Sequence, residues 1–442
     1  MNIKPDSAEI TSNGILKIGG IKVTDLVKEY GTPLYVMDVK TIRNYVHKYQ
    51  SIKEVYPNIK IAFASKALSI KALYQLLDKE GMYFDVASDG ELYTLIKAGV
   101  SPENAYFHGN NKSIEELLLA INNGIGTIVI DNHNEIGKLQ KIIKENKPSA
   151  RIKVMLRVVP EIEAHTHEFI RTGQRDTKYG FLLEEMPNVV DKILSIPELE
   201  LVGLHAHIGS QIFDIDPFKV LLAKLVELAK GLEEKKGIFL QEINLGGGFG
   251  IQYTKDDDPL CVSACSLEIV SLFKELINTM DLSKEVTLVL EPGRSVVGNA
   301  GVTLYTIGAI KNIPDIRNYI AVDGGMADNP RPITYNAEYE ADIATKMNEH
   351  KDFQASIAGK FCESGDVLIK QAEIQSPSIG DVLAIYGTGA YNYSMSSNYN
   401  RFRKPAMIFV ENGKSQLVLK RETLDDIIRN DIDLTDVFNI NS

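Results

Sequence analysis

The sequence predicts a (β/α)8 barrel joined to an antiparallel β domain, and two observations carry this prediction. Short apolar runs alternate with helix-like segments through the first two thirds of the chain. After about residue 305, the helical segments give way to strand-like runs separated by Gly, Pro, Asn or Asp. We therefore expect an α/β barrel at 34–305 and an all-β domain built from 1–33 and 306–442.

Eight apolar runs are the candidate barrel strands. They lie at 60–64, 83–87, 105–109, 127–131, 154–159, 201–209, 242–248 and 287–293. The first four begin about 22 residues apart, which leaves room for one strand, one helix and two short loops. Segments 69–81 and 89–99 show the apolar stripe of a helix and contain a glycine stop. A further strand-like run, 33–38, leads into the barrel.

Composition excludes several classes of protein. With 442 residues, 44% of them hydrophobic and 24% charged, the chain is long enough for two globular domains. The net charge is −11, so the chain lacks the excess of basic residues that is typical of nucleic-acid-binding proteins. No run approaches the roughly 18 apolar residues of a membrane span, and "MNIKPDSAEI" has no apolar signal core. Three cysteines are too few for a disulfide scaffold, so we expect a cytoplasmic protein in which Cys261 and Cys265 are packing thiols.

The stretch "IAFASKALS" (61–69) places Lys66 directly after a run that is typical of a buried strand. One interpretation is a lysine at the strand edge whose stem lies on apolar surface while its amine reaches water. The other is an amine held in apolar surroundings, where it loses its proton and forms a Schiff base. The residues at the other strand ends favour the second interpretation.

Polar residues follow nearly every candidate strand. They are Lys66, Asp85, Ser88, His108, Arg157, His205, His207, Glu291 and Arg294. In a (β/α)8 barrel the C-terminal ends of the strands form one face, and active sites lie on that face. We therefore expect these side chains to belong to one site.

The run "NLGGGFG" (244–250) places three consecutive glycines after a candidate strand. Their main-chain N–H groups can approach a phosphate closely, and a helix N-terminus after them would add to the attraction. A flexible turn is the alternative. The motif "EPGR" (291–294) adds the guanidinium of Arg294, which suits a phosphate or a carboxylate.

His205 and His207 lie two apart in "GLHAHIGSQ" (203–211), so both face the same side of a strand. Such a pair is also found in metal-dependent hydrolases. A metal site would need further ligands at other strand ends, and Arg294 would repel a cation, so we expect no metal. A flat imidazole stacked on an aromatic cofactor is the better use.

Glu291 then has a specific task. A carboxylate beside a pyridine nitrogen keeps that nitrogen protonated, and a pyridinium accepts the electron pair of a broken bond. Together with Lys66, the glycines and Arg294, this describes a pyridoxal 5′-phosphate site. In the β domain, "GKFCESGDVL" (359–368) contains Cys362, which is either a half-buried core thiol or a proton donor to a carbanion.

With these motifs the chain resembles the fold-type III, alanine-racemase-like pyridoxal phosphate decarboxylases, and among them the diaminopimelate decarboxylases. The motifs that carry the resemblance are "FASKAL", "FDVASDGEL", "HGNNKS", "THEFIRTGQRDTKYGF", "HAHIGSQ", "NLGGGFGI", "EPGRSVVGNAG", "VDGGMADNPRP", "CESGD" and "GAYNYSMSSNYN". The chain departs from the family pattern at Leu68, where asparagine is usual, in "NAEYE" after Tyr335, and in "RFRKPAM". None of these departures removes a group that the chemistry requires.

The resemblance implies a role for each matched residue. Cofactor contacts are implied for Lys66, His207, Ser210, Gly248, Glu291, Gly293, Arg294 and Tyr391. Substrate contacts are implied for Arg294, Arg331, Tyr335, Glu363 and Tyr391. The catalytic residues would be Lys66 and Cys362, the latter matching a proton donor that this family takes from the partner subunit. The resemblance therefore also implies a homodimer with shared active sites.

The implied reaction is decarboxylation of meso-2,6-diaminopimelate to L-lysine and CO2, the last step of lysine biosynthesis. A sister decarboxylase for ornithine, carboxynorspermidine or a carrier-bound amino acid is the nearest alternative. An amino-acid racemase is disfavoured by Glu291, because a racemase benefits from a weaker electron sink. A non-catalytic pyridoxal phosphate carrier would need only the barrel, and the β domain with Cys362 argues against it.

Overall fold

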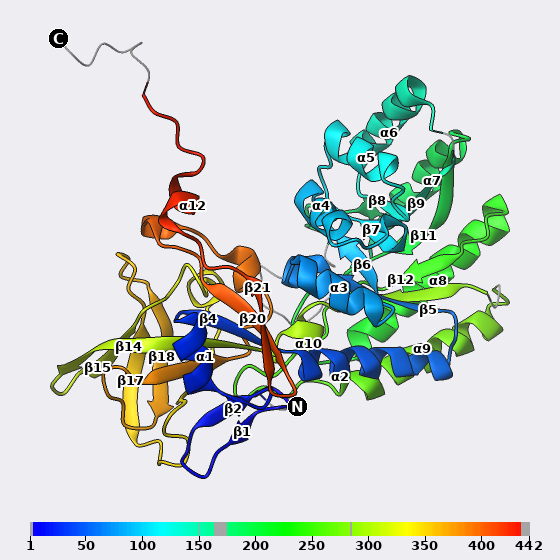
Figure 1. Ribbon diagram of the computed structural model, residues 1–442. Helices are drawn as coiled ribbons and strands as arrows, with labels where there is room; N and C mark the ends of the chain where they lie inside the picture. Colours follow the sequence, from blue (N-terminus) through cyan, green and yellow to red (C-terminus); the bar gives the residue numbers. More distant parts are fainter. Residues whose placement is uncertain (1–2, 149, 163–174, 283–284, 435–442) are drawn as a thin grey trace. The chain divides into compact units, whose positions relative to one another are not determined.

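The computed structural model describes residues 3–148, 150–162, 175–282 and 285–434, and the chain divides into two compact units (Figure 1). Val39–Gly301 and Gly387–Ser394, with the first residues of the chain, make up the first unit. Ser7–Asp38, Val302–Tyr386 and the residues from Met395 onward make up the second. The first part of the motif "THEFIRTGQRDTKYGF" lies outside the described residues. Within the described ranges, no helix is long and apolar enough to cross a membrane.

Eight parallel strands close into a barrel in the first unit, because the fifth strand of the ring pairs with the fourth as well as the sixth, and the eighth pairs with the first. In order they are β5 (Ile59–Ala64), β6 (Tyr83–Val86), β7 (Ala105–Phe107), β8 (Thr127–Ile130), β9 (Ile152–Val159), β11 (Leu199–His205), β12 (Glu242–Asn244) and β13 (Thr287–Leu290). A short strand, β10 (Phe181–Leu182), extends the sheet beside β9. The predicted barrel and its eight strands are confirmed.

Helices alternate with the strands of this unit, as the apolar stripes predict (Figure 1). They are α2 (Val39–Gln50), α3 (Lys71–Lys79), α4 (Asp89–Lys97), α5 (Ile114–Asn122), α6 (His133–Asn146), α7 (Met186–Leu194), α8 (Asp216–Lys236), α9 (Val262–Thr279) and α10 (Arg294–Val297). Their starts follow local chemistry: the Ser113 hydroxyl and the Glu116 carboxylate, for example, form a reciprocal capping box at α5. Cys265 is buried on α9, whereas Cys261 at the start of α9 is exposed.

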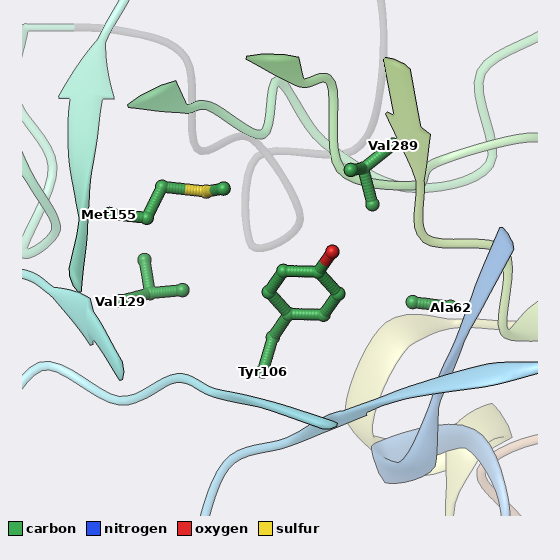
Figure 2. Packing of buried hydrophobic residues seen from close by; sticks show 5 residues of the cluster. All are labelled: Ala62, Tyr106, Val129, Met155 and Val289. Carbon is green, nitrogen blue, oxygen red and sulfur yellow. The ribbon is translucent and has the colours of Figure 1, made fainter. Parts of the chain in front are cut away.

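Apolar side chains fill the inside of the barrel (Figure 2). They come from five strands and are Ala62, Tyr106, Val129, Met155 and Val289, none more than 3% exposed. The hydroxyl of Tyr106 donates a hydrogen bond to the buried carboxylate of Glu242, 2.8 Å away. Because the interior is packed, a ligand can reach the barrel only at its ends, as is usual for this fold.

The second unit is built mainly of strands. They are β1 (Glu9–Ile10), β2 (Leu16–Ile18), β3 (Ile21–Lys22), β4 (Leu34–Asp38), β14 (the strand from Gly301 to Ile313), β15 (Arg317–Val322), β16 (Ala341–Ile343), β17 (Phe353–Ala358), β18 (Val367–Ile374), β19 (Val382–Tyr386), β20 (Ala406–Glu411) and β21 (Lys414–Leu419). Its helices are α1 (Val23–Tyr30), α11 (Arg331–Tyr335) and α12 (Leu424–Ile428). The main sheet has the order β18-β17-β15-β14-β4-β20-β21.

Two pairings in this sheet differ from the predicted antiparallel arrangement. Strand β15 pairs with β17 in parallel, and β4 pairs with β20 in parallel. The run predicted to lead into the barrel is β4, whose fully buried residues form a central strand of the second unit instead. A continuous apolar run is typical of a strand that is covered on both faces, but it does not reveal which sheet the strand joins.

Candidate active site

Lys66 lies on a short 3-10 turn, Ser65–Ala67, that directly follows β5. Its side chain is accessible to solvent, whereas its two neighbours on the turn are buried. The C-terminal end of β5 therefore presents an accessible amine on a fixed backbone.

The prediction of apolar surroundings for Lys66 is wrong. Partial desolvation by the surrounding protein lowers the pKa of its amine, and the nearby Arg157 lowers it too. Three residues around it, Asp85, Tyr391 and Glu291, raise the pKa by more, so the net shift is upward. Without a cofactor the amine therefore keeps its proton, and that proton must leave before the amine can attack a carbonyl group.

The carboxylate of Glu291, which follows β13, is held by side chains from three other strands. His108, after β7, places Nε2 3.0 Å from Oε1, and His205, at the end of β11, places Nε2 3.1 Å from Oε2. Asn244, the last residue of β12, donates its amide N–H to Oε1 at 2.6 Å. All four residues are buried. We call this group the carboxylate clamp.

Charges within the clamp favour an ionised Glu291. Burial alone raises the pKa of the Glu291 carboxyl, but the two imidazoles lower it well below its usual range. Burial lowers the pKa of His205 to about 4, so this ring is neutral at pH 7. Burial also lowers the pKa of His108, but Asp85 and Glu291 raise it by more, and the net shift is upward.

The two histidines of the HxH pair have different surroundings. Strand β11 ends at His205, so His207 lies beyond the strand and is only partly buried. Burial lowers the pKa of His207 well below its usual range, and the nearby Lys66 adds to this, which leaves a neutral imidazole suited to stacking. Among the described residues, His108, His205 and Glu291 bring ligand atoms within 4.8 Å of one another, a grouping that a metal ion could use, but His207 is not in it.

The glycine run forms a loop after β12 that approaches other backbone closely. A Cβ on Gly247 would lie 2.1 Å from the Glu291 carbonyl oxygen, and one on Gly248 would lie 2.5 Å from the Gly209 carbonyl oxygen. Gly248 also has a φ of +120°, so only glycine fits there. The predicted helix N-terminus directly behind this loop is wrong, because α9 begins only at Val262.

The glycine loop is joined to the loop after β11. Ile212 donates its N–H to the Gly248 carbonyl oxygen at 2.9 Å, and Gly250 donates back to Ile212 at 3.1 Å. The Gln211 side chain continues this pattern: its Nε2 donates to the Ile251 carbonyl oxygen at 2.7 Å, and its Oε1 accepts from the Ile251 N–H at 3.2 Å. The two loops thus form one hydrogen-bonded unit.

Arg294 lies at the start of α10 and connects several site residues. Its Nη2 donates to the Ser210 hydroxyl at 3.0 Å, and its Nη1 donates to the Tyr253 hydroxyl at 2.5 Å. The guanidinium carbon lies 4.7 Å from the centre of the Tyr391 ring, so the two stack. Arg294 Nε has no hydrogen-bond partner among the described residues. The buried Nε–H is therefore an unused donor within the site.

Arg157 and Ser88 complete the set of predicted strand-end residues. The Arg157 guanidinium stacks over the Tyr179 ring at 4.0 Å and lies 3.9 Å from an Asp131 carboxylate oxygen. Ser88 has a structural position: its hydroxyl caps α4 by accepting a hydrogen bond from the Glu91 N–H at 3.2 Å.

The remaining predicted residues belong to the second unit. Arg331 is buried at the start of α11, and its Nη1 donates to the Tyr339 hydroxyl at 2.6 Å. Tyr335, at the other end of α11, is half-buried. Cys362 and Glu363 are exposed neighbours on the loop after β17. The exposure of Cys362 excludes one of its two sequence interpretations, that of a half-buried core thiol.

Sequence reasoning missed several residues of the site. Asn244 and Gln211 lie inside the quoted motifs, but side-chain amides bonded to a neighbouring loop or carboxylate leave no periodic signal. On the Cys362 loop, Asn400 accepts the Cys362 N–H at 2.8 Å, and Asp366 accepts the Phe361 N–H at 2.9 Å. No spacing rule connects these positions, because the contacts depend on tertiary structure.

The barrel site fits pyridoxal phosphate. It combines an accessible amine at Lys66, a close-packed glycine loop, an arginine with an unused donor and an ionised carboxylate. The amine suits an aldehyde, and the glycine loop and the arginine suit a phosphate. The carboxylate suits a protonated ring nitrogen. The fold and the site together define a pyridoxal-phosphate-dependent enzyme of the (β/α)8-barrel class.

Comparison with known proteins agrees with a pyridoxal-phosphate-dependent enzyme. Residues 42–298 match the family model described as pyridoxal-dependent decarboxylase, pyridoxal binding domain. The chain is 46% identical over 427 residues to the diaminopimelate decarboxylase of Bacillus subtilis (strain 168), covering 95% of this chain and 96% of that protein. It is 41% identical over 429 residues to that of Staphylococcus aureus (strain COL), with coverages of 96% and 99%.

Solved structures show the same likeness. The crystal structure of the diaminopimelate decarboxylase from M. jannaschii in complex with L-lysine matches with a TM-score of 0.90 and 32% identity, covering 98% of this chain and 99% of that one. The lysine/ornithine decarboxylase of Vibrio vulnificus, at 19% identity and a TM-score of 0.73, shares the fold. The chain belongs to the pyridoxal-dependent decarboxylases, and pyridoxal phosphate is its cofactor.

Proposed function

We propose that this protein decarboxylates meso-2,6-diaminopimelate and releases L-lysine and CO2, the last step of lysine biosynthesis. The observation that carries this function is the nearly complete alignment with diaminopimelate decarboxylases, at 46% identity over 95% of the chain for one of them. The barrel site supports it, because an ionised carboxylate beside the ring nitrogen favours the strong electron sink that a decarboxylation needs.

Residues of the barrel unit hold the cofactor. The Lys66 amine binds it covalently, and Ser210, with Gly248 of the glycine loop, binds its phosphate. His207 would stack on the ring of the bound cofactor, and Glu291 would keep the ring nitrogen protonated. Gly293, Arg294 and Tyr391 complete the contacts by position in the family motifs. When bound, pyridoxal phosphate accepts the electron pair that the departing carboxyl group leaves on the α-carbon.

Residues that match the family motifs act on the substrate. Arg294, Arg331 and Tyr335 bind its polar groups, together with Glu363 and Tyr391. Cys362 donates the proton that replaces the carboxyl group on the α-carbon. A thiol can act as a proton donor to a carbanion.

We further infer that the enzyme is a homodimer in which Cys362 and Glu363 act in the partner's site, and that it is cytoplasmic. The exposure of both residues on one loop supports the dimer, since a proton donor from a partner must project outward. Mixing equal amounts of Lys66→Ala and Cys362→Ala proteins should restore about a quarter of the wild-type activity. Verified subunit exchange without any recovery would contradict the shared site.

The function is tested by measuring CO2 release from a panel of amino acids. Wild-type protein should release CO2 from meso-diaminopimelate and form L-lysine, with kcat/KM for ornithine, lysine and carboxynorspermidine lower by several orders of magnitude. Equal efficiency with ornithine or lysine would favour a sister decarboxylase. Exchange of the α-hydrogen with solvent, without CO2 release, would favour a racemase.

A further inference from the structure

We propose that His108 and Asn244 are positioning residues that hold the Glu291 carboxylate in one orientation toward the cofactor ring. The inference rests on the proposed role of Glu291 and concerns two residues that touch neither substrate nor cofactor in that proposal. It starts from the carboxylate clamp, in which three donors occupy the two oxygens of Glu291 at 2.6–3.1 Å.

A glutamate carboxylate has a broad rotational well about its last bond, so nothing intrinsic fixes its plane. In the clamp, His205 holds Oε2, whereas His108 and Asn244 both hold Oε1. Rotation about the last bond would break all three contacts together. Because each donor comes from a different barrel strand, the plane of the carboxylate is set by the barrel itself.

The orientation of the Asn244 amide follows from its second contact. Its Oδ1 accepts the Gly246 N–H at 2.8 Å, so its NH2 group is the end that faces Glu291. Gly246 in turn accepts the Glu291 N–H at 2.8 Å through its carbonyl oxygen. Asn244 therefore ties the carboxylate to the first glycine of the glycine loop, and a shift of one moves the other.

His108 acts through Nε2 and not through Nδ1. This nitrogen lies 3.0 Å from Glu291 and 3.7 Å from an Asp85 oxygen, so the shorter contact takes the hydrogen bond. The His108 ring also meets the His205 ring edge to face, with 4.7 Å between the centres. Both contacts of the ring, the hydrogen bond to Glu291 and the edge-to-face contact with His205, are to members of the carboxylate clamp.

A positioning role makes predictions that a packing role does not. If His108 only fills space, a phenylalanine of similar shape replaces it at little cost to the cofactor. If its Nε2 donor matters, glutamine restores function, because the glutamine side-chain nitrogen lies close to the place of Nε2. The comparison of His108→Phe with His108→Gln therefore separates shape from hydrogen bonding.

The experiment measures cofactor affinity, the absorption spectrum of the bound cofactor, kcat and KM in these two variants and in Asn244→Leu. Tyr106→Phe is the matched control. Tyr106 lies on β7, two residues before His108, and packs inside the barrel. The variant removes its buried hydrogen bond to the buried carboxylate of Glu242. It should lower the melting temperature and leave the spectrum and kcat unchanged.

We expect His108→Phe and Asn244→Leu to change the bound-cofactor spectrum and to lower kcat roughly 10- to 100-fold, because each loses one hydrogen bond to a charged group. KM should change by less than about threefold, and His108→Gln should recover most of the lost kcat. If His108→Phe keeps the wild-type spectrum and kcat, or if His108→Gln is as impaired as His108→Phe, the positioning role is wrong. Failure of the wild-type protein to decarboxylate diaminopimelate would contradict the proposed function alone, because the spectrum and the affinity are measured without substrate.

Discussion

The main-chain N–H of Tyr391 donates a hydrogen bond to the carbonyl oxygen of Ala67, 2.8 Å away. Tyr391 has a φ of +65°, a conformation that costs a non-glycine residue about 1 kcal/mol or more. Ser394 adds a second bond from its hydroxyl to the same oxygen, at 3.2 Å. A segment more than 300 residues away in sequence is therefore part of the barrel unit and fixes the turn that carries Lys66.

Lys66→Ala should abolish the covalent link to the cofactor and nearly all turnover, because no other amine stands in its place on the turn. The purified wild-type protein should be yellow, and borohydride reduction should attach the cofactor to one peptide that contains residue 66. Mass spectrometry of the digest checks the attachment. Turnover of Lys66→Ala at the wild-type rate would contradict the assignment.

Gln211→Ala should weaken binding of pyridoxal phosphate by about 10- to 30-fold. The change removes the two side-chain hydrogen bonds of Gln211 that help to join the loops after β11 and β12, each worth roughly 1 kcal/mol. Pyridoxal, which lacks the phosphate, should bind to the variant almost as well as to wild type. Titration of the apoenzyme with both compounds measures the two affinities. An equal loss of affinity for both compounds would mean that the loops after β11 and β12 do not act through the phosphate.

The barrel and the strand-end residues could be predicted because parallel strands leave a local signal. Each strand is a short apolar run at a regular spacing, and the polar residue that ends it is adjacent in sequence. The electrostatic state of Lys66 could not be predicted in the same way. Its pKa depends on Asp85 and Glu291, which reach it from the ends of other strands, so the expected neutral amine is a protonated one.

The second unit shows the same limit at the level of the sheet. Strand β4 is visible in sequence as an apolar run, but its parallel partner β20 lies about 370 residues further along the chain. Nothing local indicates this pairing. The Cys362 loop is a similar case, since Asn400 and Asp366 orient it through contacts that only the folded chain brings together.

Asp328 in the second unit should make stability fall as pH rises. Burial raises the pKa of its carboxyl to about 7, with smaller contributions from Asp323 and Asp366, whereas the unfolded chain has an aspartate pKa of about 4. Between these two pKa values the carboxyl is ionised in the unfolded chain but still protonated in the folded one. The free energy of unfolding therefore decreases by up to roughly 4 kcal/mol between pH 4 and 7.

Asp328→Asn should therefore gain stability relative to wild type as pH rises from 5 to 8. Urea unfolding at both pH values measures the difference. Asp256→Asn, which changes an exposed aspartate, is the control and should show no such trend. A constant difference between Asp328→Asn and wild type across this range would mean that the carboxyl is ionised throughout.

Arg331 should decide between substrates. Diaminopimelate carries a second amino-acid group at its far end, and a guanidinium can bind the distal carboxylate through two parallel hydrogen bonds. Lysine and ornithine lack that carboxylate, so they cannot form this two-bond contact with the guanidinium. Wild-type protein should therefore prefer diaminopimelate by about 10⁴-fold over either analogue.

Arg331→Ala should reduce that preference at least 100-fold through a higher KM for diaminopimelate, while the affinity for pyridoxal phosphate stays unchanged. Arg331→Lys should recover only part of the loss, because an ammonium cannot form the two-bond contact. Tyr339→Phe is the matched control: it removes the hydroxyl 2.6 Å from Arg331 but keeps the guanidinium, so it should raise KM by a smaller factor. If Arg331→Ala keeps the wild-type ratio of kcat/KM for diaminopimelate over lysine, another cation binds the distal carboxylate, and Arg294 is then the residue to change next.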